Sequence, residues 1–314
     1  PDVANSVAIG SVDAGIVWSA TAAQYEALDA IPVSELQKGA SQITIGITSW
    51  AQPAAAALNF ARFVAGGNRG LPIFAGLGYE PVDGDPWRAH PELTFFAGSV
   101  NRRALEPVIQ RFEVREGVRI NTVYNGCGIL TAQMKTIRDN RDPGFPDVYM
   151  ACDVYYLDTV AELFGEGTRL SQTDIVIAVA KGNPKGIHSL ADLARPGVRV
   201  AIGQPEQCTI GVLTRRLLES VELYQKLLEE NVVTQTASSA MLVPAVATGA
   251  ADATLAYRTD TLSETARIDA VSINRPLAKA VQPFAVARAT EYRQLSERLF
   301  LEVLGAQADF ETAG

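Results

Sequence analysis

The central stretch of the chain, residues 181–206, reads KGNPKGIHSLADLARPGVRVAIGQPE. An apolar strand, DIVIAVA (174–180), leads into it, and a second strand, VRVAI (198–202), lies near its end. The residues between the two strands are polar and rich in glycine and proline, which is typical of a solvated loop, and we expect His188 to lie in it. The stretch therefore predicts two buried strands joined by an exposed connection.

The same alternation of strand and helix extends to both sides of this stretch. The predicted strands are LTFFA (93–97), RINTVY (119–124), DVYMA (147–151), DIVIAVA (174–180), VRVAI (198–202) and ATLAY (253–257). Between the first two, Leu105, Val108 and Phe112 fall at helical spacing and predict an amphipathic helix. Strands that alternate with helices indicate an α/β fold with parallel-rich sheets. Ligands of such sheets bind at the carboxyl ends of the strands.

The composition excludes several classes of protein. The chain has 314 residues, 47% of them hydrophobic, so it can bury a sizeable core in one large or two ordinary domains. Its 27 Lys and Arg against 35 Asp and Glu give a net charge of −8, which argues against a nucleic-acid partner. Three cysteines are too few for a disulfide scaffold, and two histidines limit histidine-based metal or acid–base chemistry.

Small and hydroxyl-bearing residues follow the predicted strands. The loops concerned are Ala97-Gly98-Ser99, Asn125-Gly126-Cys127-Gly128, Cys152-Asp153 and residues 203–211. Small residues let backbone N–H groups at helix N-termini approach an anion closely, and hydroxyls add further donors. The sequence shows no Ser-His-Asp motif, no paired catalytic carboxylates and no glycine-rich phosphate loop. We therefore expect a protein that binds a ligand rather than an enzyme.

The stretch at 181–206 resembles the central signature of the molybdate-binding family of periplasmic substrate-binding proteins. FAGSVNRRALEPVIQRFE (96–113) is similar to the opening strand, loop and helix of that family, and the likeness covers residues 93–314. The resemblance implies a type II periplasmic-binding-protein fold, with two α/β lobes, a hinge, and molybdate or tungstate captured between the lobes. It also implies a protein without a cofactor that works outside the cytoplasm, free or membrane-anchored, and delivers its ligand to an ABC permease.

The resemblance also implies which residues hold the oxyanion. They are Gly98, Ser99, Gly126, Cys127, Gly128, Thr209, Ile210, Ser239 and Tyr257. Ser99 and Tyr257 match hydroxyl donors of the family, whereas Cys127 stands where the family has a serine. Ile210 or its neighbour, and a position near Ser239, match residues that donate backbone N–H groups. Neutral donors at helix N-termini can hold a doubly charged anion without a counter-charge.

The three cysteines leave two other hypotheses open, because all of them fall in the predicted ligand loops. Cys127, Cys152 and Cys208 as thiolates would suit soft ions such as copper or zinc better than an oxyanion. The second hypothesis is therefore an accessory protein of the same fold with a metal or redox site. A Cys127–Cys152 disulfide is a further alternative, since an extracytoplasmic compartment permits it. The third hypothesis is a scaffold module that binds no ligand.

Residues 1–80 repeat part of the pattern found near the end of the chain. VANSVAIGSVDAGIVW (3–18) aligns with LVPAVATGAADATLAY (242–257) at a constant offset, which pairs Gly10 with Gly249. Both segments predict the end of a helix, a glycine turn and a buried strand.

A second part of the repeat lies at 43–66, where we expect a strand followed by an amphipathic helix. The predicted domains are 1–80, the C-terminal part of a preceding and incomplete module; 81–92, a linker rich in proline and glycine; and 93–314, a complete two-lobe module. Since 1–80 lacks the front of its own sheet, we expect it to rest on a neighbour, such as an upstream module of the same protein.

Overall fold

The computed structural model describes residues 2–36, 39–140 and 142–313. The chain divides into two compact units, and each is described here by itself. The smaller unit comprises Pro1–Pro91 with the short segments Val114–Val118 and Glu291–Gln294, and the larger unit comprises the remainder. All strands of the described residues belong to the larger unit.

The larger unit is built on strands β1 to β9. Their bounds are β1 (Glu92–Gly98), β2 (Arg119–Asn125), β3 (Val148–Met150), β4 (Thr168–Ala180), β5 (Val200–Gly203), β6 (Val232–Thr236), β7 (Ala253–Tyr257), β8 (Ile268–Ser272) and β9 (Lys279–Val286). They follow the order β2-β1-β3-β9-β4-β7-β5-β6, and β8 pairs with β4. The pairs of β1 with β2 and β3, and of β5 with β6 and β7, are parallel, whereas β4 and β9 pair antiparallel. The predicted α/β class with parallel-rich sheets is confirmed.

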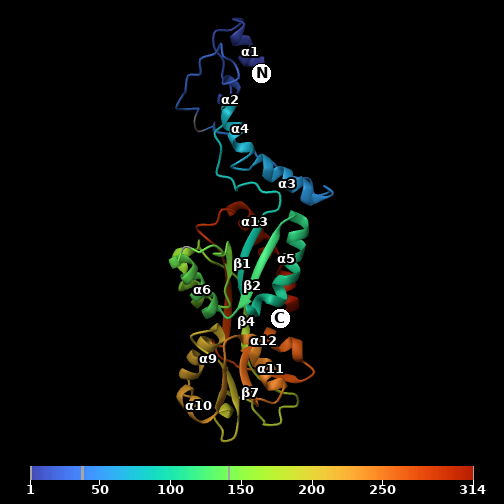
Figure 1. The fold of residues 1–314 in the computed structure, drawn as a ribbon, viewed down its shortest axis with the longest axis vertical. Coiled ribbons are helices and arrows are strands. Elements are labelled where there is room, and N and C mark those ends of the chain that lie inside the picture. The colour runs from blue at the N-terminus through green and yellow to red at the C-terminus, as the bar shows by residue number, and fades with distance from the viewer. Residues whose placement is uncertain (1, 37–38, 141, 314) are drawn as a thin grey trace. The chain divides into compact units, whose positions relative to one another are not determined.

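Strand β4 belongs to two sheets and joins two lobes (Figure 1). Its first half, 168–174, pairs with β9, and its second half, from Ile175 onward, pairs with β7 and β8. The first lobe therefore contains β1, β2, β3 and β9, and the second contains β5, β6, β7 and β8. The chain crosses between the lobes a second time between β8 and β9. Two crossing segments of this kind form the expected hinge.

Helices cover both sheets. Those of the first lobe are α5 (Arg102–Glu116), α6 (Cys127–Asn140), α7 (Val154–Asp158), α13 (Arg293–Gly305) and α14 (Gln307–Ala313), with the 3-10 turns η2 (Ser99–Asn101) and η3 (Ala161–Leu163). Those of the second lobe are α8 (Leu190–Leu193), α9 (Thr209–Glu219), α10 (Tyr224–Glu230), α11 (Leu242–Ala247) and α12 (Arg258–Thr261), with η4 (Ser239–Met241) and η5 (Leu262–Glu264). Helix α6 packs on β1, α9 on β5 and α11 on β7. None of the helices within the described ranges is long and apolar enough to cross a membrane.

The core of the larger unit lies between these sheets and helices. Its largest fully buried side chains include Phe95, Phe112 and Phe284 in the first lobe, and β7 is buried along its whole length. Tyr149 in β3 and Tyr257 in β7 are equally buried. A buried tyrosine normally finds a hydrogen-bond partner for its hydroxyl, so these two residues direct attention to the ends of their strands.

The smaller unit contains helices and loops but no strand among its described residues. Its helices are α1 (Asp2–Ala8), α2 (Ser19–Ala22), α3 (Ala54–Val64) and α4 (Gly70–Gly76). Helix α3 is the one expected in 43–66, and Gly10 after α1 has a φ of 76°, as has Gly249 after α11. The strands expected in 3–18 and 43–66 are not formed, so that part of the prediction is wrong. A strand needs neighbours for its N–H and C=O groups, and no strand of this unit supplies them.

Candidate functional site

The residues expected to bind the ligand lie at strand ends in both lobes, as predicted. Gly98 ends β1, Ser99 begins η2, Gly126 precedes α6, Cys127 and Gly128 begin α6, Thr209 and Ile210 begin α9, Ser239 begins η4 and Tyr257 ends β7. The first N–H groups of α6 and α9 have no acceptor within their own helices. The fold therefore gathers backbone donors and hydroxyls where β2 and β5 lead into helices.

Hydrogen bonds join the two lobes at these strand ends. The hydroxyls of Ser99 in the first lobe and Ser238 in the second are 3.1 Å apart. The Tyr156 hydroxyl of α7 donates to the carbonyl of Pro205 in the second lobe at 3.0 Å. The strand ends of the two lobes are thus in direct contact, as in a closed cleft.

Gly126 makes this close contact between the lobes feasible. A Cβ at this position would lie 2.7 Å from the carbonyl oxygen of Gln207 and still closer to that of Ala237, both in the second lobe. Its N–H donates to the side-chain oxygen of Asn125 at 2.8 Å. The structure therefore gives Gly126 a role in lobe contact, and its N–H is already engaged.

Buried hydroxyls near these strand ends have no hydrogen-bond partner. They belong to Tyr149, Thr209, Ser239 and Tyr257. Thr209 is 1% exposed and Tyr257 0% exposed. Leaving such a group unpaired costs about 1–3 kcal/mol. Unpaired buried hydroxyls also occur elsewhere, at Thr173, Thr214 and Ser296. The four named here come from strand or helix ends of both lobes, where a ligand or a water could complete them, so they mark a candidate binding site.

Cys127 and Cys152 form a pair of free thiols in the first lobe. Their Sγ atoms are 2.9 Å apart, and the N–H of Cys152 donates to the Sγ of Cys127 at 3.2 Å. A Cβ on Gly98 would lie 2.8 Å from the Sγ of Cys127 and would overlap that of Cys152, so only glycine fits beside the pair. Thr209 of the second lobe lies near both thiols, although its hydroxyl makes no hydrogen bond of normal geometry.

The two thiols differ in acidity. Burial alone would raise the pKa of Cys127, but hydrogen bonds from the side chain and backbone of Cys152, together with the neighbouring Thr209 hydroxyl, lower it to about 7. The same hydrogen bond to Cys127, together with burial, raises the pKa of Cys152 well above its usual range. The position of Cys127 at the N-terminus of α6 also favours its thiolate. One thiol of the pair therefore ionises near neutral pH while the other stays protonated.

Cys208 lies apart from this pair. It is the N-cap residue of α9, and its Sγ donates to the carbonyl of Thr236 at 3.5 Å. Burial raises the pKa of its thiol to about 11. Within the described ranges, no three His, Cys, Asp or Glu side chains form a group that could hold a metal ion. The structure thus does not form the metal site suggested for Cys127, Cys152 and Cys208.

Sequence reasoning missed several residues of this region. Asp153 caps α7, and its carboxylate also accepts the N–H of Val281 in β9 at 3.0 Å. Asp260 lies near Ser239 without a hydrogen bond of normal geometry, and burial raises the pKa of its carboxyl to about 6. No sequence signal distinguishes Tyr149 within the wholly buried β3. Recognition of β6 could have drawn attention to Ser238, which follows its end.

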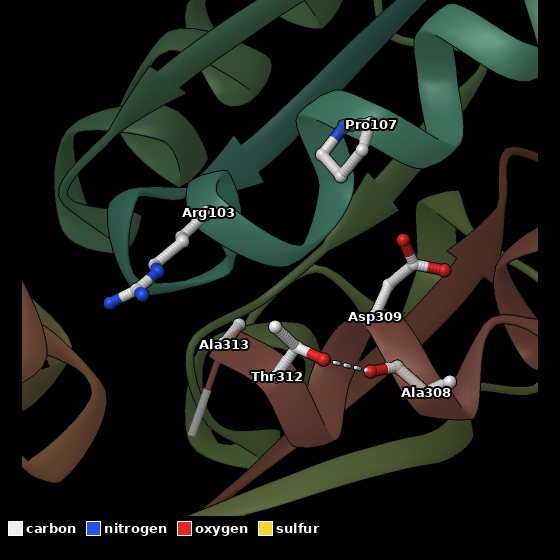
Figure 2. Close-up of a pocket in the computed structure, with 6 residues that line it drawn as sticks. All are labelled: Arg103, Pro107, Ala308, Asp309, Thr312 and Ala313. Carbon is white, nitrogen blue, oxygen red and sulfur yellow. Dashed lines mark hydrogen bonds between the residues drawn. The ribbon is translucent and has the colours of Figure 1, made fainter.

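A separate hollow of about 240 Å³ lies on the first lobe between α5 and α14 (Figure 2). It is lined by Arg103, Pro107, Ala308, Asp309, Thr312 and Ala313. The carboxylate of Asp309 is paired with Arg111 at 2.7 and 3.0 Å, and the Thr312 hydroxyl donates to the carbonyl of Ala308 at 2.8 Å. Because these polar groups are engaged, and none of the expected ligand residues lines it, the hollow is not a candidate for the ligand site.

Comparisons with known sequences agree with this geometry. The model of a family described as bacterial extracellular solute-binding protein matches residues 93–311. Molybdate-binding protein ModA from Mycobacterium bovis and from Mycobacterium tuberculosis is 30% identical over 206 residues, which are 64% of this chain and 74% of the relative. A sulfate-binding protein from Synechococcus elongatus is 25% identical over 129 residues, 37% of this chain and 36% of that protein.

Solved structures show the same fold. The sulfate-binding protein SubI from Mycobacterium tuberculosis has a TM-score of 0.62 at 18% identity, covering 72% of this chain and 86% of that one. The periplasmic molybdate-binding protein of Azotobacter vinelandii has a TM-score of 0.59 at 18% identity, covering 71% and 97%. At these identities the likeness concerns the fold alone, and it confirms the expected two-lobe architecture of type II periplasmic binding proteins.

Proposed function

Because this chain belongs to the bacterial extracellular solute-binding protein family, we propose that it captures a tetrahedral oxyanion between its two lobes. Molybdate is the expected ligand, with tungstate as its close chemical analogue. Capture would be followed by closure and by delivery to an ABC permease, with no covalent chemistry and no cofactor. The protein would work in the periplasm or another extracytoplasmic space.

The unpaired buried hydroxyls carry this proposal. The hydroxyls of Thr209 and Tyr257 are buried and make no hydrogen bond of normal geometry, and both lie near the Cys127 thiol of the opposite lobe. A ligand rich in acceptor oxygens would complete these donors, and an apolar ligand would not. The unpaired hydroxyls therefore favour an oxyanion.

The charge of the proposed site also suits an anion. Apart from the ionisable thiol of Cys127, the residues expected to hold the ligand are uncharged. The helices α6 and α9 begin among them, and the first N–H groups of a helix have no acceptor one turn before them in that helix. Helix N-termini of this length carry a partial positive charge that stabilises an anion without a salt bridge. A fixed set of neutral donors also selects by size, since every donor must reach its own acceptor oxygen.

The relatives favour molybdate over sulfate. Molybdate-binding relatives match 206 residues at 30% identity, whereas the sulfate-binding relative matches 129 residues at 25%. Cys127 stands at a position where a hydroxyl is expected, and a thiol is a weaker donor. We therefore expect molybdate to bind more weakly here than it would with serine at this position.

Calorimetric titration of the fully reduced chain tests the proposal. We expect molybdate to bind one site per chain and sulfate to bind at least roughly tenfold more weakly. Tyr257→Phe removes one donor and should lower molybdate affinity roughly tenfold, the value of one hydrogen bond to a charged group. The variant should unfold no more easily than the wild type, because the lost hydroxyl has no partner within the protein.

Tyr224→Phe in α10 is the matched control, since Tyr224 lies outside the proposed site and should leave binding unchanged. If the reduced chain binds neither molybdate nor sulfate, the proposal is contradicted. In that case, uptake of Cu(I) by the reduced protein would favour the soft-metal accessory protein, and no response to either would favour a ligand-free scaffold. Equal binding by the wild type and Tyr257→Phe would remove Tyr257 from the site.

A further inference from the structure

The thiols of Cys127 and Cys152 form a feature that oxyanion capture does not require. We infer that they are a reversible dithiol–disulfide couple, oxidised by exchange with a disulfide, and that the disulfide form switches off oxyanion binding. The second part of this inference rests on the proposed function. The first part, formation of the bond, does not.

The geometry of the pair is close to that of a disulfide. The Sγ atoms are 2.9 Å apart, and a disulfide bond requires a further approach to about 2.0 Å. Both cysteines belong to the first lobe, at the end of β3 and at the start of α6, so the bond needs no rearrangement between lobes. Gly98 leaves the space beside both sulfurs free of a side chain. The bond therefore requires only small local shifts.

The difference in acidity between the two thiols determines which of them reacts first with a disulfide. Cys127 is the more acidic thiol, and its thiolate is the nucleophile. It attacks a disulfide RSSR, forms the mixed disulfide Cys127–S–S–R and releases RS⁻. Cys152 then loses its proton and attacks the Sγ of Cys127, forming the protein disulfide and releasing the second RS⁻. Two protein thiols are oxidised, one RSSR is reduced, and the two protons leave with the two RSH.

Cleft closure controls access to this chemistry. Cys127 is 0% exposed and Cys152 is 3% exposed when the lobes are in contact, so RSSR reaches them only when the lobes part. An oxyanion that holds the lobes closed should therefore slow oxidation. Formation of the disulfide also affects the ligand site, because it removes the Cys127 thiol beside Thr209, which donates an S–H hydrogen bond in its protonated form. A site built on hydrogen-bond donors should bind oxyanions less well after that loss.

The test uses the full chain treated either with oxidised glutathione or with a phosphine reductant. Peptide mapping should find a Cys127–Cys152 disulfide in the oxidised sample, and molybdate should slow its formation. Molybdate affinity should fall roughly tenfold or more on oxidation and return on reduction. Cys152→Ser should abolish the effect of oxidised glutathione on affinity, whereas the matched control Cys208→Ser should keep it.

The outcomes separate the two proposals. If no Cys127–Cys152 disulfide forms, or if glutathione remains attached to Cys127, the couple is refuted whatever the ligand. A disulfide that forms without changing molybdate affinity refutes the switch. If the reduced chain binds no oxyanion while the disulfide forms as expected, the proposed function and the switch fail, and the couple itself stands.

Discussion

Asp260 is a buried carboxyl whose ionisation affects stability. Burial raises its pKa to about 6, against 3.8 for an ordinary aspartate. A group with a higher pKa in the folded chain stabilises the fold while it is protonated, and this contribution is lost as pH rises. The window runs from about pH 4 to about pH 6, and the difference corresponds to about 3 kcal/mol. Above that window the folded protein holds a buried carboxylate at a constant cost.

Asp260→Asn should remove this dependence, because an amide is neutral at every pH in the window. The free energy of unfolding is measured with urea for both proteins. The value for the variant minus the value for the wild type should rise by up to about 3 kcal/mol between about pH 4 and pH 7, because only the wild type is destabilised by ionisation of Asp260. The control is Asp269→Asn, since a hydrogen bond from Lys181 lowers the pKa of Asp269 and no such gain is expected. A stability difference that stays flat with pH would show that Asp260 titrates normally.

For single residues, the sequence could indicate which ones lie at the ends of strands, but not which side chains they contact or how deeply they are buried. Resemblance placed Ser99, Thr209 and Tyr257 at strand ends, and the structure brings hydroxyls of both lobes together there. Neither the pairing of Cys127 with Cys152 nor the isolation of Cys208 could be read from spacing, because each depends on side-chain direction. The burial of Asp260 likewise depends on packing that a four-residue helix does not encode.

At the level of the elements, the alternating pattern of the sequence predicted six of the nine strands in the described residues, including the wholly buried β7 and the partly exposed β2, and it missed β6, β8 and β9. β7 lies where the apolar run 253–257 indicated, with every residue buried. β6 and β8 are five residues long and each has a single buried residue, so their apolar signal is weak. β4 begins at Thr168 rather than at Asp174, because its polar first half pairs with β9 in the other lobe. A strand that serves two sheets has no single periodicity.

Asp153 links α7 and β9 of the first lobe, and its loss should destabilise that lobe. Its carboxylate caps α7 through the N–H of Tyr155 at 3.1 Å and accepts the N–H of Val281 in β9 at 3.0 Å. Asp153→Ala leaves both donors without their acceptor and should cost about 2–4 kcal/mol of unfolding free energy in urea. Asp153→Asn retains one acceptor oxygen and should recover about half. Equal losses for both variants would mean that charge, rather than the two hydrogen bonds, carries the effect.

At the level of the whole molecule, the two segments whose sequences align, 3–18 and 242–257, differ in how far they are covered. At equivalent positions, Ile16 is 77% exposed and Leu255 is 0% exposed, and Trp18 is 63% exposed against 0% for Tyr257. The second segment contains β7, which lies between β4 and β5 and pairs with both of them. Residues 3–18 have the helix and the glycine turn, which are local, but not the strand, which requires partners far away in sequence. The local sequence pattern therefore predicted the helix and the glycine turn correctly. It could not predict whether the strand forms, because that depends on neighbouring strands.

Exposure of this kind should make the smaller unit the first part of the chain to be cut. Thermolysin cleaves beside apolar residues, and Ile9, Ile16, Ile31 and Trp50 are exposed in segments without regular structure. Limited digestion followed by intact mass should show cleavage between residues 9 and 53 well before any within β1 to β9. The strands of the larger unit serve as the internal control, since most of their apolar residues are buried. Survival of 1–80 as a resistant fragment would instead mean that it buries its apolar residues by itself, and that the partner expected from the repeat is not needed.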